Sequence, residues 1–189
     1  MKKIGKKGFT LIELLAVITI MGILMLVAIP AISRTIENSR RDTFANTAKE
    51  YLNAVRNAVL ADNITCGTGS SAKVASATPD GTYYFKLNST SIGELMEAGG
   101  KSPFGNADLK GYVKWVKTTS SNKTKTTYSM SLTDTGKHGL TTDNNASPAP
   151  KEVAENLISR GNVSTKLSAE SAEAPTAATG ETITECKLS

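Results

Sequence analysis

The stretch KKIGKKGFTLIELLAVITIMGILMLVAIP, residues 2–30, decides how the rest of this 189-residue chain is organised. A cluster of four lysines and the small residue Gly8 precede an almost wholly apolar run of 21 residues, from Phe9 to Ile29. At a rise of about 1.5 Å per residue, a helix of that length spans roughly the 30 Å hydrocarbon core of a bilayer. The lysine cluster predicts that the N-terminal end of this helix stays in the cytoplasm.

One acidic residue, Glu13, interrupts the apolar run, which contains no lysine or arginine. A carboxylate inside a membrane span costs on the order of a few kcal/mol, so it marks a functional residue with a partner to be found. A cut after Gly8 would give Phe9 an α-amino group, which is mostly protonated at neutral pH because its reference pKa is about 8. That cation would lie four residues from Glu13 on the same helix face. A pair within one chain, or between staggered neighbouring chains, would explain the acid.

Residues 6–15, KKGFTLIELL, resemble the prepilin signature of type IV pilins and pseudopilins. A basic leader, a glycine before the cut, a phenylalanine after it and a glutamate four residues further on stand at the family's spacing. The resemblance implies that a membrane-bound prepilin peptidase, an aspartate protease, cuts between Gly8 and Phe9 and methylates the new Phe9 amine. It also implies that Glu13 meets the Phe9 amine of an adjacent subunit in the assembled filament.

Two other classes of N-terminal segment fit less well. An ordinary secretory signal peptide has an apolar core of roughly 7–15 residues followed by its cleavage site. Here the run is longer and the small residue stands before it. An ordinary signal anchor fits the lysines and the length, but it leaves Glu13 unexplained.

The basic character of the chain comes largely from the leader. The formal charge is +5, with 22 basic and 17 acidic residues. The first eight residues carry four lysines and no acid, so a mature chain has 18 basic residues against 17 acidic ones and is close to neutral. The charge therefore indicates topology, and no direct nucleic-acid site is evident.

Two residues weaken the apolar helix. Gly22 costs about 1 kcal/mol relative to alanine. Pro30 deletes the hydrogen bond to the carbonyl of Leu26 and kinks or locally opens a helix. The resemblance to pilins implies that the helix opens between Gly22 and Pro30 when subunits pack into a filament. In the unassembled chain the helix is expected to be either continuous or bent.

Beyond Pro30 the pattern becomes amphipathic without a turn signal. Apolar residues recur at helical spacing from Ile32 and Ile36 through Phe44 to Val59, which predicts one helix from about Phe9 to Asp62. A free coiled coil is the alternative, but the apolar period is not a sustained heptad.

The rest of the chain predicts a small α+β head. Residues 63–81 look like a loop, 83–87 like a strand, and 91–98 like a short helix with Ser91 as N-cap, Glu94 as its capping-box partner and Gly99 as the stop. Residues 111–118 and 125–133 alternate as the two strands of a hairpin. In the remainder, 151–160 is expected to form a short helix and 168–180 to be solvated and mobile.

The predicted fold class is therefore α+β and type IV pilin-like. The predicted regions are a leader (1–8), a hydrophobic transmembrane and filament-core helix (9–30), an amphipathic spine helix (31–62), a globular head (63–140) and a C-terminal extension (141–189).

The chain has two cysteines, Cys66 and Cys186. A membrane-anchored chain with its bulk outside the cytoplasm meets oxidising conditions, so we expect an intrachain disulfide that ties the extension to the head. Two free thiols, or a bridge between subunits, are the alternatives.

Other candidate sites are poor. His138 is the only histidine and is expected to be a solvated loop residue. Asp134, Asp143 and Asn144 offer oxygen ligands for calcium, but nothing enforces their spacing. We expect no metal, no cofactor and no catalytic residue, so the chain is the substrate of an enzyme and not an enzyme itself.

The sequence thus predicts a structural subunit of a type IV pilus, used in adhesion, motility or DNA uptake. A pseudopilin or minor pilin of a type II secretion or competence filament is the alternative, and a monomeric membrane-anchored binding protein is a third. By resemblance, the partners are further copies of the chain, the prepilin peptidase and methyltransferase, a pilus assembly ATPase and an inner-membrane platform. The prepilin would cross the cytoplasmic membrane once, and the assembled pilus would be extracellular.

Overall fold

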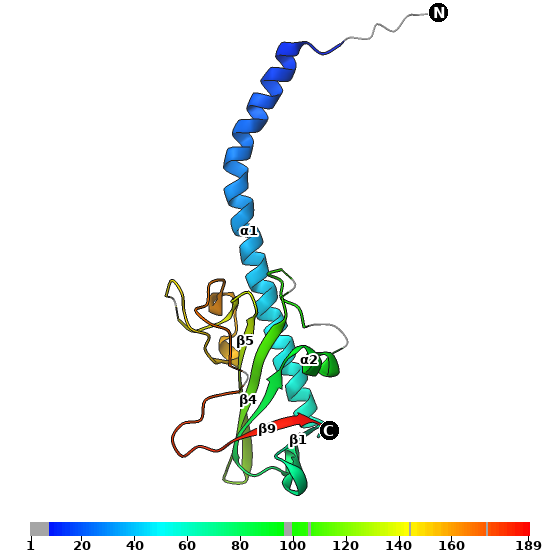
Figure 1. The fold of residues 1–189 in the computed structure, drawn as a ribbon, viewed down its shortest axis with the longest axis vertical. Coiled ribbons are helices and arrows are strands. Elements are labelled where there is room, and N and C mark those ends of the chain that lie inside the picture. The colour runs from blue at the N-terminus through cyan, green and yellow to red at the C-terminus, as the bar shows by residue number, and fades with distance from the viewer. Residues whose placement is uncertain (1–7, 97–99, 106, 144, 173) are drawn as a thin grey trace, which may run out of the picture. The chain divides into compact units, whose positions relative to one another are not determined.

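A computed structural model describes residues 8–96, 100–105, 107–143, 145–172 and 174–189 (Figure 1). The contacts between residues divide the chain into two compact units, Met1–Ser39 and Arg40–Ser189. The fold is α+β, with a long N-terminal helix and a sheet made mainly of antiparallel strands, as the sequence predicted.

The first unit is the N-terminal part of helix α1, which as a whole covers Leu11–Leu60. The helix is uninterrupted from Gly22 to Pro30, the proline lying inside it. The large apolar side chains that the structure describes in this unit are all exposed, from Phe9 at 91% to Ile36 at 48%. The predicted amphipathic stripe is therefore not buried by the described residues at Ile32 or Ile36.

In the second unit, α1 buries one stripe against the head. The buried residues recur every three or four positions, as one face of a helix requires. They are Phe44, Ala45, Ala48, Tyr51, Leu52, Val55 and Ala58. The hydroxyl of Tyr51 also accepts a hydrogen bond from the backbone N–H of Gly100 at 2.6 Å, which ties the helix to a loop of the head.

One mixed sheet forms the head within the described residues (Figure 1). Its order is β2-β1-β9-β3-β4-β5-β6-β8, with β7 pairing β5. The strands are β1 (Ile64–Cys66), β2 (Lys73–Val74), β3 (Gly81–Leu87), β4 (Leu109–Ser120), β5 (Lys123–Asp134), β6 (Gly139–Leu140), β7 (Val153–Ala154), β8 (Val163–Ser164) and β9 (Ile183–Leu188). Alternation along β4 and β5 buries Val113, Trp115, Met130 and Leu132 in the core with α1. The predicted strand at 83–87 and the predicted hairpin are confirmed.

The C-terminal strand β9 is the main feature that the sequence did not predict. It lies between β1 and β3, antiparallel to the first and parallel to the second (Figure 1). Cys186 of β9 is the register partner of Cys66 in β1, and the two form a disulfide. The expected bridge is present, and it joins two neighbouring strands of the sheet.

Two local predictions are wrong, the loop at 63–81 and the capping of the short helix, and a third is not tested. The region 63–81 is not all loop, because it contains β1, β2 and the 3-10 helices η1 (Gly69–Ser71) and η2 (Ala75–Ala77). Helix α2 covers Ser89–Leu95 with Asn88 as N-cap, and Ser91 is the capping-box partner, since each accepts from the other's backbone N–H at 2.9 Å. Gly99, the predicted stop, lies outside the described residues.

The C-terminal extension also differs from its prediction. Residues 151–160 form no α-helix, because β7 pairs with β5 and is followed by the 3-10 helices η3 (Glu155–Leu157) and η4 (Arg160–Asn162). Ser171, in the segment expected to be solvated, is buried. Its hydroxyl lies 2.7 Å from that of Ser131, and its N–H donates to the Thr133 hydroxyl at 2.8 Å. These polar contacts hold Ser171 on the sheet, and apolar residues of the extension such as Val153, Ile158 and Val163 join the core.

Candidate processing and assembly site

Gly8, Phe9 and Thr10 stand before the first turn of α1 and are exposed. A Cβ atom built at Gly8 would meet no atom within 4 Å, and the Gly8 φ angle is not in the left-handed region. The fold itself therefore does not require glycine here. A small residue at this position is instead consistent with a requirement of an enzyme that cuts the chain after it.

Glu13 lies in the first turn of α1, where it forms a capping box with Thr10. One carboxylate oxygen, Oε2, accepts hydrogen bonds from the Thr10 N–H and from the Thr10 hydroxyl, each at 2.8 Å. In return, the Glu13 N–H donates to the Thr10 hydroxyl at 3.3 Å. This is the Thr-x-x-Glu arrangement that satisfies free donors at a helix N-terminus. The Thr-x-x-Glu spacing is present at residues 10–13, but this capping box was not predicted from the sequence.

The capping box fixes where the carboxylate points. Thr10 is bonded directly to Phe9, and its N–H is one of the two donors to Glu13. The carboxylate is thus turned toward the N-terminal end of the helix, where a helix favours negative charge. An α-amino group created at Phe9 would be separated from the bonded Thr10 N–H by one residue only.

The surface around this carboxylate is apolar. Glu13 is the only charged residue between Phe9 and Ser33, and the large apolar side chains of the segment are exposed. By length and composition, α1 is the one helix in the described part of the chain that is able to cross a membrane. An exposed surface of this kind must be covered by lipid or by other protein surfaces.

The contacts that the structure describes around Gly22 and Pro30 do not explain why these residues stand in the apolar helix. A Cβ at Gly22 would meet no atom within 4 Å, so packing within the chain does not demand glycine there. Pro30 lies within the helix, and the Ser33 hydroxyl donates to the carbonyl of Ile29 at 3.0 Å. Opening of the helix between Gly22 and Pro30 stays a prediction.

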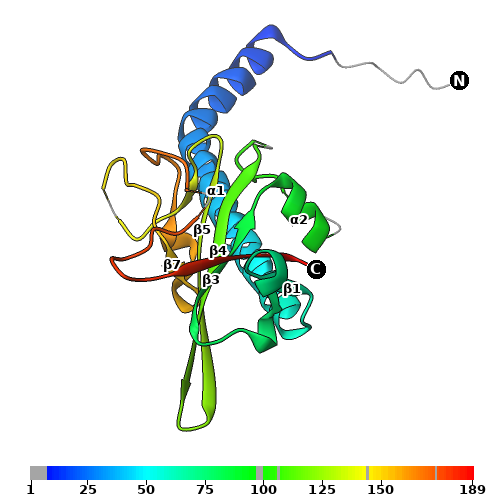
Figure 2. The same ribbon diagram turned by 60° about the horizontal axis from the view of Figure 1, so that its bottom comes forward.

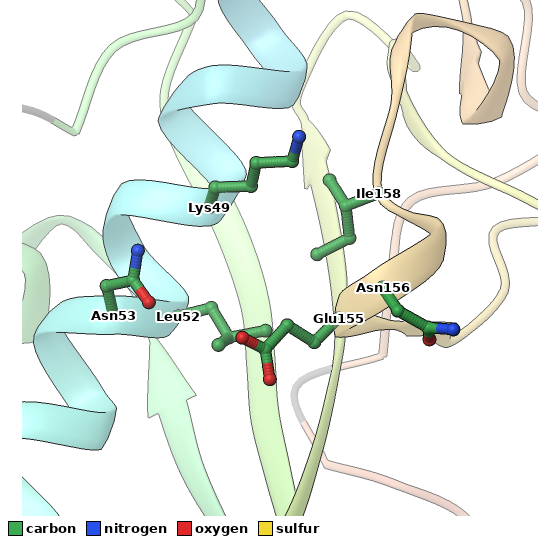
Figure 3. A pocket seen from close by; sticks show the side chains of 6 residues that line it. All are labelled: Lys49, Leu52, Asn53, Glu155, Asn156 and Ile158. Atoms are coloured by element: carbon green, nitrogen blue, oxygen red, sulfur yellow. The ribbon is translucent and has the colours of Figure 1, made fainter.

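The head offers a groove between α1 and η3, with a volume of about 300 Å³ (Figure 3). Its lining residues are Lys49, Leu52, Asn53, Glu155, Asn156 and Ile158. The Glu155 carboxylate is already paired with Arg56, whose guanidinium lies 4.7 Å above the centre of the Tyr128 ring. The described residues that line the groove include no histidine, cysteine, serine or threonine that could serve as a nucleophile or its partner base.

The residues considered for calcium are not brought together. Asp134 is fully buried and bonds His138, whereas Asp143 pairs with Lys151 at 2.8 Å. Asn144 lies outside the described residues. No group of three or more metal-ligating side chains occurs among the residues that the structure describes. His138 was expected to be a solvated loop residue, but its ring stacks on Phe104 with centroids 4.5 Å apart.

Comparison with known proteins identifies the N-terminal segment. Residues 4–29 match the family model for the prokaryotic N-terminal methylation motif, the prepilin-type cleavage and methylation signature of type IV pilins. No curated protein and no solved structure gives a significant match. The motif, together with the long helix packed on a sheet, supports the assignment of this chain to the type IV pilin or pseudopilin type. Together with the apolar helix, the motif also fits a membrane-anchored precursor. The motif indicates a structural subunit.

Proposed function

We propose that this chain is a structural subunit of a type IV pilus, processed between Gly8 and Phe9 and polymerised into a helical surface filament. One observation carries the proposal. The exposed apolar part of α1, which bears the methylation motif, holds a single carboxylate between Phe9 and Ser33. This carboxylate, Glu13, is turned toward the residue that would become the N-terminus.

The precursor would sit in the cytoplasmic membrane through the apolar half of α1, with the leader lysines in the cytoplasm. Prepilin peptidase would cut after Gly8 and methylate the Phe9 amine. Cleavage removes the four lysines of the leader, so the mature chain begins with the apolar segment. This segment would leave the bilayer without moving four charges through the hydrocarbon core.

In the filament, Glu13 would pair with the Phe9 amine of an adjacent subunit. Before that contact forms, Thr10 satisfies the carboxylate within the chain. The ion pair would therefore replace the neutral Thr10 donors with the Phe9 ammonium group of the adjacent subunit. A hydrogen bond between two charged groups is stronger than one from a neutral donor, and the surroundings here are apolar. This exchange favours subunits stacked at the correct stagger over subunits dispersed in lipid.

The remaining steps follow the same plan. The apolar surface from Phe9 to Ile36 would be buried among copies of α1, with the helix opening between Gly22 and Pro30. A pilus assembly ATPase and an inner-membrane platform would drive extraction from the bilayer. The head, closed by the Cys66–Cys186 disulfide, would form the outer surface of an extracellular pilus.

A pseudopilin or minor pilin of a secretion or competence filament is the second candidate, because the same motif serves both kinds of subunit. For both kinds of filament, the presence of Glu13 favours a place in the filament body over a place at its tip. The two differ in where the filament ends, at the cell surface or within the envelope.

Expression of this chain as the only pilin-like subunit, in cells that retain the assembly machinery, tests the proposal. We expect filaments that shear from the surface, are visible by electron microscopy and contain this chain as their main protein. A chain that is processed but never leaves the envelope would favour the pseudopilin. Retention of the unprocessed chain in the membrane would contradict both.

A further inference from the structure

The distal ends of β4 and β5 form a two-stranded arm, which we define as residues 118–127. The pairing of β3 with β4 ends at Gly81 and Lys117, and β7 pairs β5 only at Ser129 and Met130. Beyond these points the two strands pair only with each other, as far as Ser120 and Lys123. Figure 2 shows this hairpin projecting past the other strands of the head. A two-stranded ribbon is marginal on its own in water, so its length is not explained by stability.

The arm has an unusual composition for a β-ribbon. Its sequence, TTSSNKTKTT, contains seven hydroxyl residues, one asparagine and two lysines, and no acidic or apolar residue. Residues 118–125 are all exposed. The turn at Ser121 and Asn122 has φ angles of 50° and 62°, the left-handed conformation of a tight two-residue hairpin turn. The arm therefore presents donors and positive charge to solvent and no apolar surface.

The positive charge of the arm lies on one face of the hairpin. Lys123 and Lys125 are opposite Ser120 and Thr118, so they share a face with Lys110 and Lys114 nearer the head. These two inner lysines are neutralised by carboxylates of the C-terminal extension. Lys110 pairs with Glu170, and Lys114 pairs with Glu152 at 2.7 Å.

The two lysines of the arm have no such partner in the described part of the chain. The carboxylate of Asp80 does bond the arm, but it does so through the N–H and hydroxyl of Thr119, which belongs to the opposite face. At the base of the arm, the Lys117 ammonium donates to the carbonyls of Ser76 and Thr78 at 2.9 and 2.8 Å. Within the arm, the positive charges that no carboxylate of the described residues neutralises are therefore those of Lys123 and Lys125.

The chemistry of the arm favours a phosphate-bearing partner. Lysine, serine, threonine and asparagine side chains are among the groups that contact nucleic-acid phosphates. The major groove of duplex DNA, about 12 Å wide, admits a two-stranded β-ribbon. Because the arm has no aromatic residue, it offers no platform for stacking the bases of a single strand. Because it has no apolar residue, it offers nothing to insert into a bilayer.

We propose that the arm docks the phosphate backbone of duplex nucleic acid through Lys123 and Lys125, with the hydroxyl residues adding contacts. The proposal concerns a single head and does not depend on polymerisation. In a filament, repetition of the arm would raise the avidity of weak individual contacts without any new contact.

The test measures binding of fluorescently labelled duplex DNA to the processed full-length chain in nanodiscs of zwitterionic lipid. The processed chain is required because the leader lysines would bind DNA themselves. The test variant is Lys123→Gln/Lys125→Gln. The matched control is Lys49→Gln/Lys166→Gln, which removes two exposed lysines outside the arm.

We expect the wild type and the control to bind, with affinity falling as salt rises. In the test variant the slope of log affinity against log salt should be smaller by about 2, since each phosphate contact contributes about 0.9. The variant Lys123→Arg/Lys125→Arg should bind as the wild type does. Equal losses in the test and control variants, or no binding by the wild type at low salt, would overturn the proposal. So would arm-dependent binding to anionic lipid vesicles without binding to DNA.

Discussion

The carboxylate of Glu13 accepts two hydrogen bonds from Thr10, one from its N–H and one from its hydroxyl, through the same oxygen at 2.8 Å. This contact explains how a charged residue is held at the start of an apolar helix before any other subunit is present. It also orients the carboxylate toward Phe9. The same residue is therefore prepared for an ion pair that would form only after cleavage.

Removal of the Glu13 carboxylate should separate processing from assembly. In Glu13→Ala, cleavage and methylation should continue, since the cut lies before the helix, whereas incorporation should be lost when this variant is the only subunit. Immunoblotting of the processed chain and electron microscopy of sheared material measure the two steps. Glu94→Ala, which removes an exposed carboxylate of the head, is the control. Normal filaments from Glu13→Ala would rule out the charge-pairing mechanism.

Loss of the Thr10 hydroxyl should reduce filament assembly less than loss of the Glu13 carboxylate. Thr10→Val removes one of the two donors to the carboxylate and the acceptor for the Glu13 N–H. We expect processed chain at wild-type levels and several-fold fewer filaments, because the carboxylate is no longer held in place. Thr10→Ser keeps the hydroxyl and should restore assembly. Equal filament yields from Thr10→Val and Thr10→Ser would show that the capping box has no part in assembly.

Gly8 should be required by the peptidase and not by the fold. A Cβ atom at this position meets no atom within 4 Å among the described residues, and the position precedes the helix, so Gly8→Ala and Gly8→Val should leave the helix content unchanged. Both should slow cleavage, the larger residue more strongly, as followed by a pulse-chase experiment. Gly22→Ala is the matched control, because a methyl group meets no atom there either and the site is remote from the cut. Full-rate cleavage of Gly8→Val would place the processing site elsewhere.

The Cys66–Cys186 disulfide should stabilise the head by joining β1 to β9. Cys66→Ser/Cys186→Ser should lower the free energy of unfolding by about 2–5 kcal/mol, the usual cost of losing a native bridge. Thermal unfolding followed by circular dichroism measures the change. The wild type under reducing conditions should match the variant. Two free thiols in a non-reducing mass measurement would show that the bridge is absent.

The pair of Asp134 and His138 should be a second source of stability. The Asp134 side chain has no exposed surface, and its carboxylate accepts from the His138 N–H at 2.8 Å and contacts the ring Nδ1 at 2.8 Å. His138→Leu leaves this buried carboxylate without its ring partner and should cost about 1–3 kcal/mol. Thr135→Ala, at an exposed neighbour, should have little effect. In a double-mutant cycle with Asp134→Asn, additive losses would show that the two residues do not interact.

Features with a strong local pattern were predictable. The apolar run, the helix that follows it and the alternation along β4 and β5 all stand out in the sequence, and the structure has them. Strand β9 did not stand out, because ITECKL is short, carries two charges and gains its place only by inserting between β1 and β3. Its pairing is non-local, and no sequence period encodes it.

The candidate site was partly predictable, because some of its residues also belong to a local sequence pattern. Gly8, Phe9 and Glu13 follow from their spacing, and the Thr10 capping box was visible but overlooked. The burial of Ser171 on the sheet was not visible, since a segment rich in Ser, Glu and Ala looks solvated until its polar partners are known. The start of helix α2 was misplaced because Asn88 and Ser91 are both good capping residues, and only the fold shows which one begins it.

The most direct test of the proposed function is an intact-mass measurement and N-terminal analysis of protein sheared from the cell surface. We expect a chain that begins at N-methylated Phe9 and is lighter by the two hydrogens that the disulfide removes. A chain that still begins at Met1 and is found only in membranes would contradict it, and Glu13 would then have no explanation.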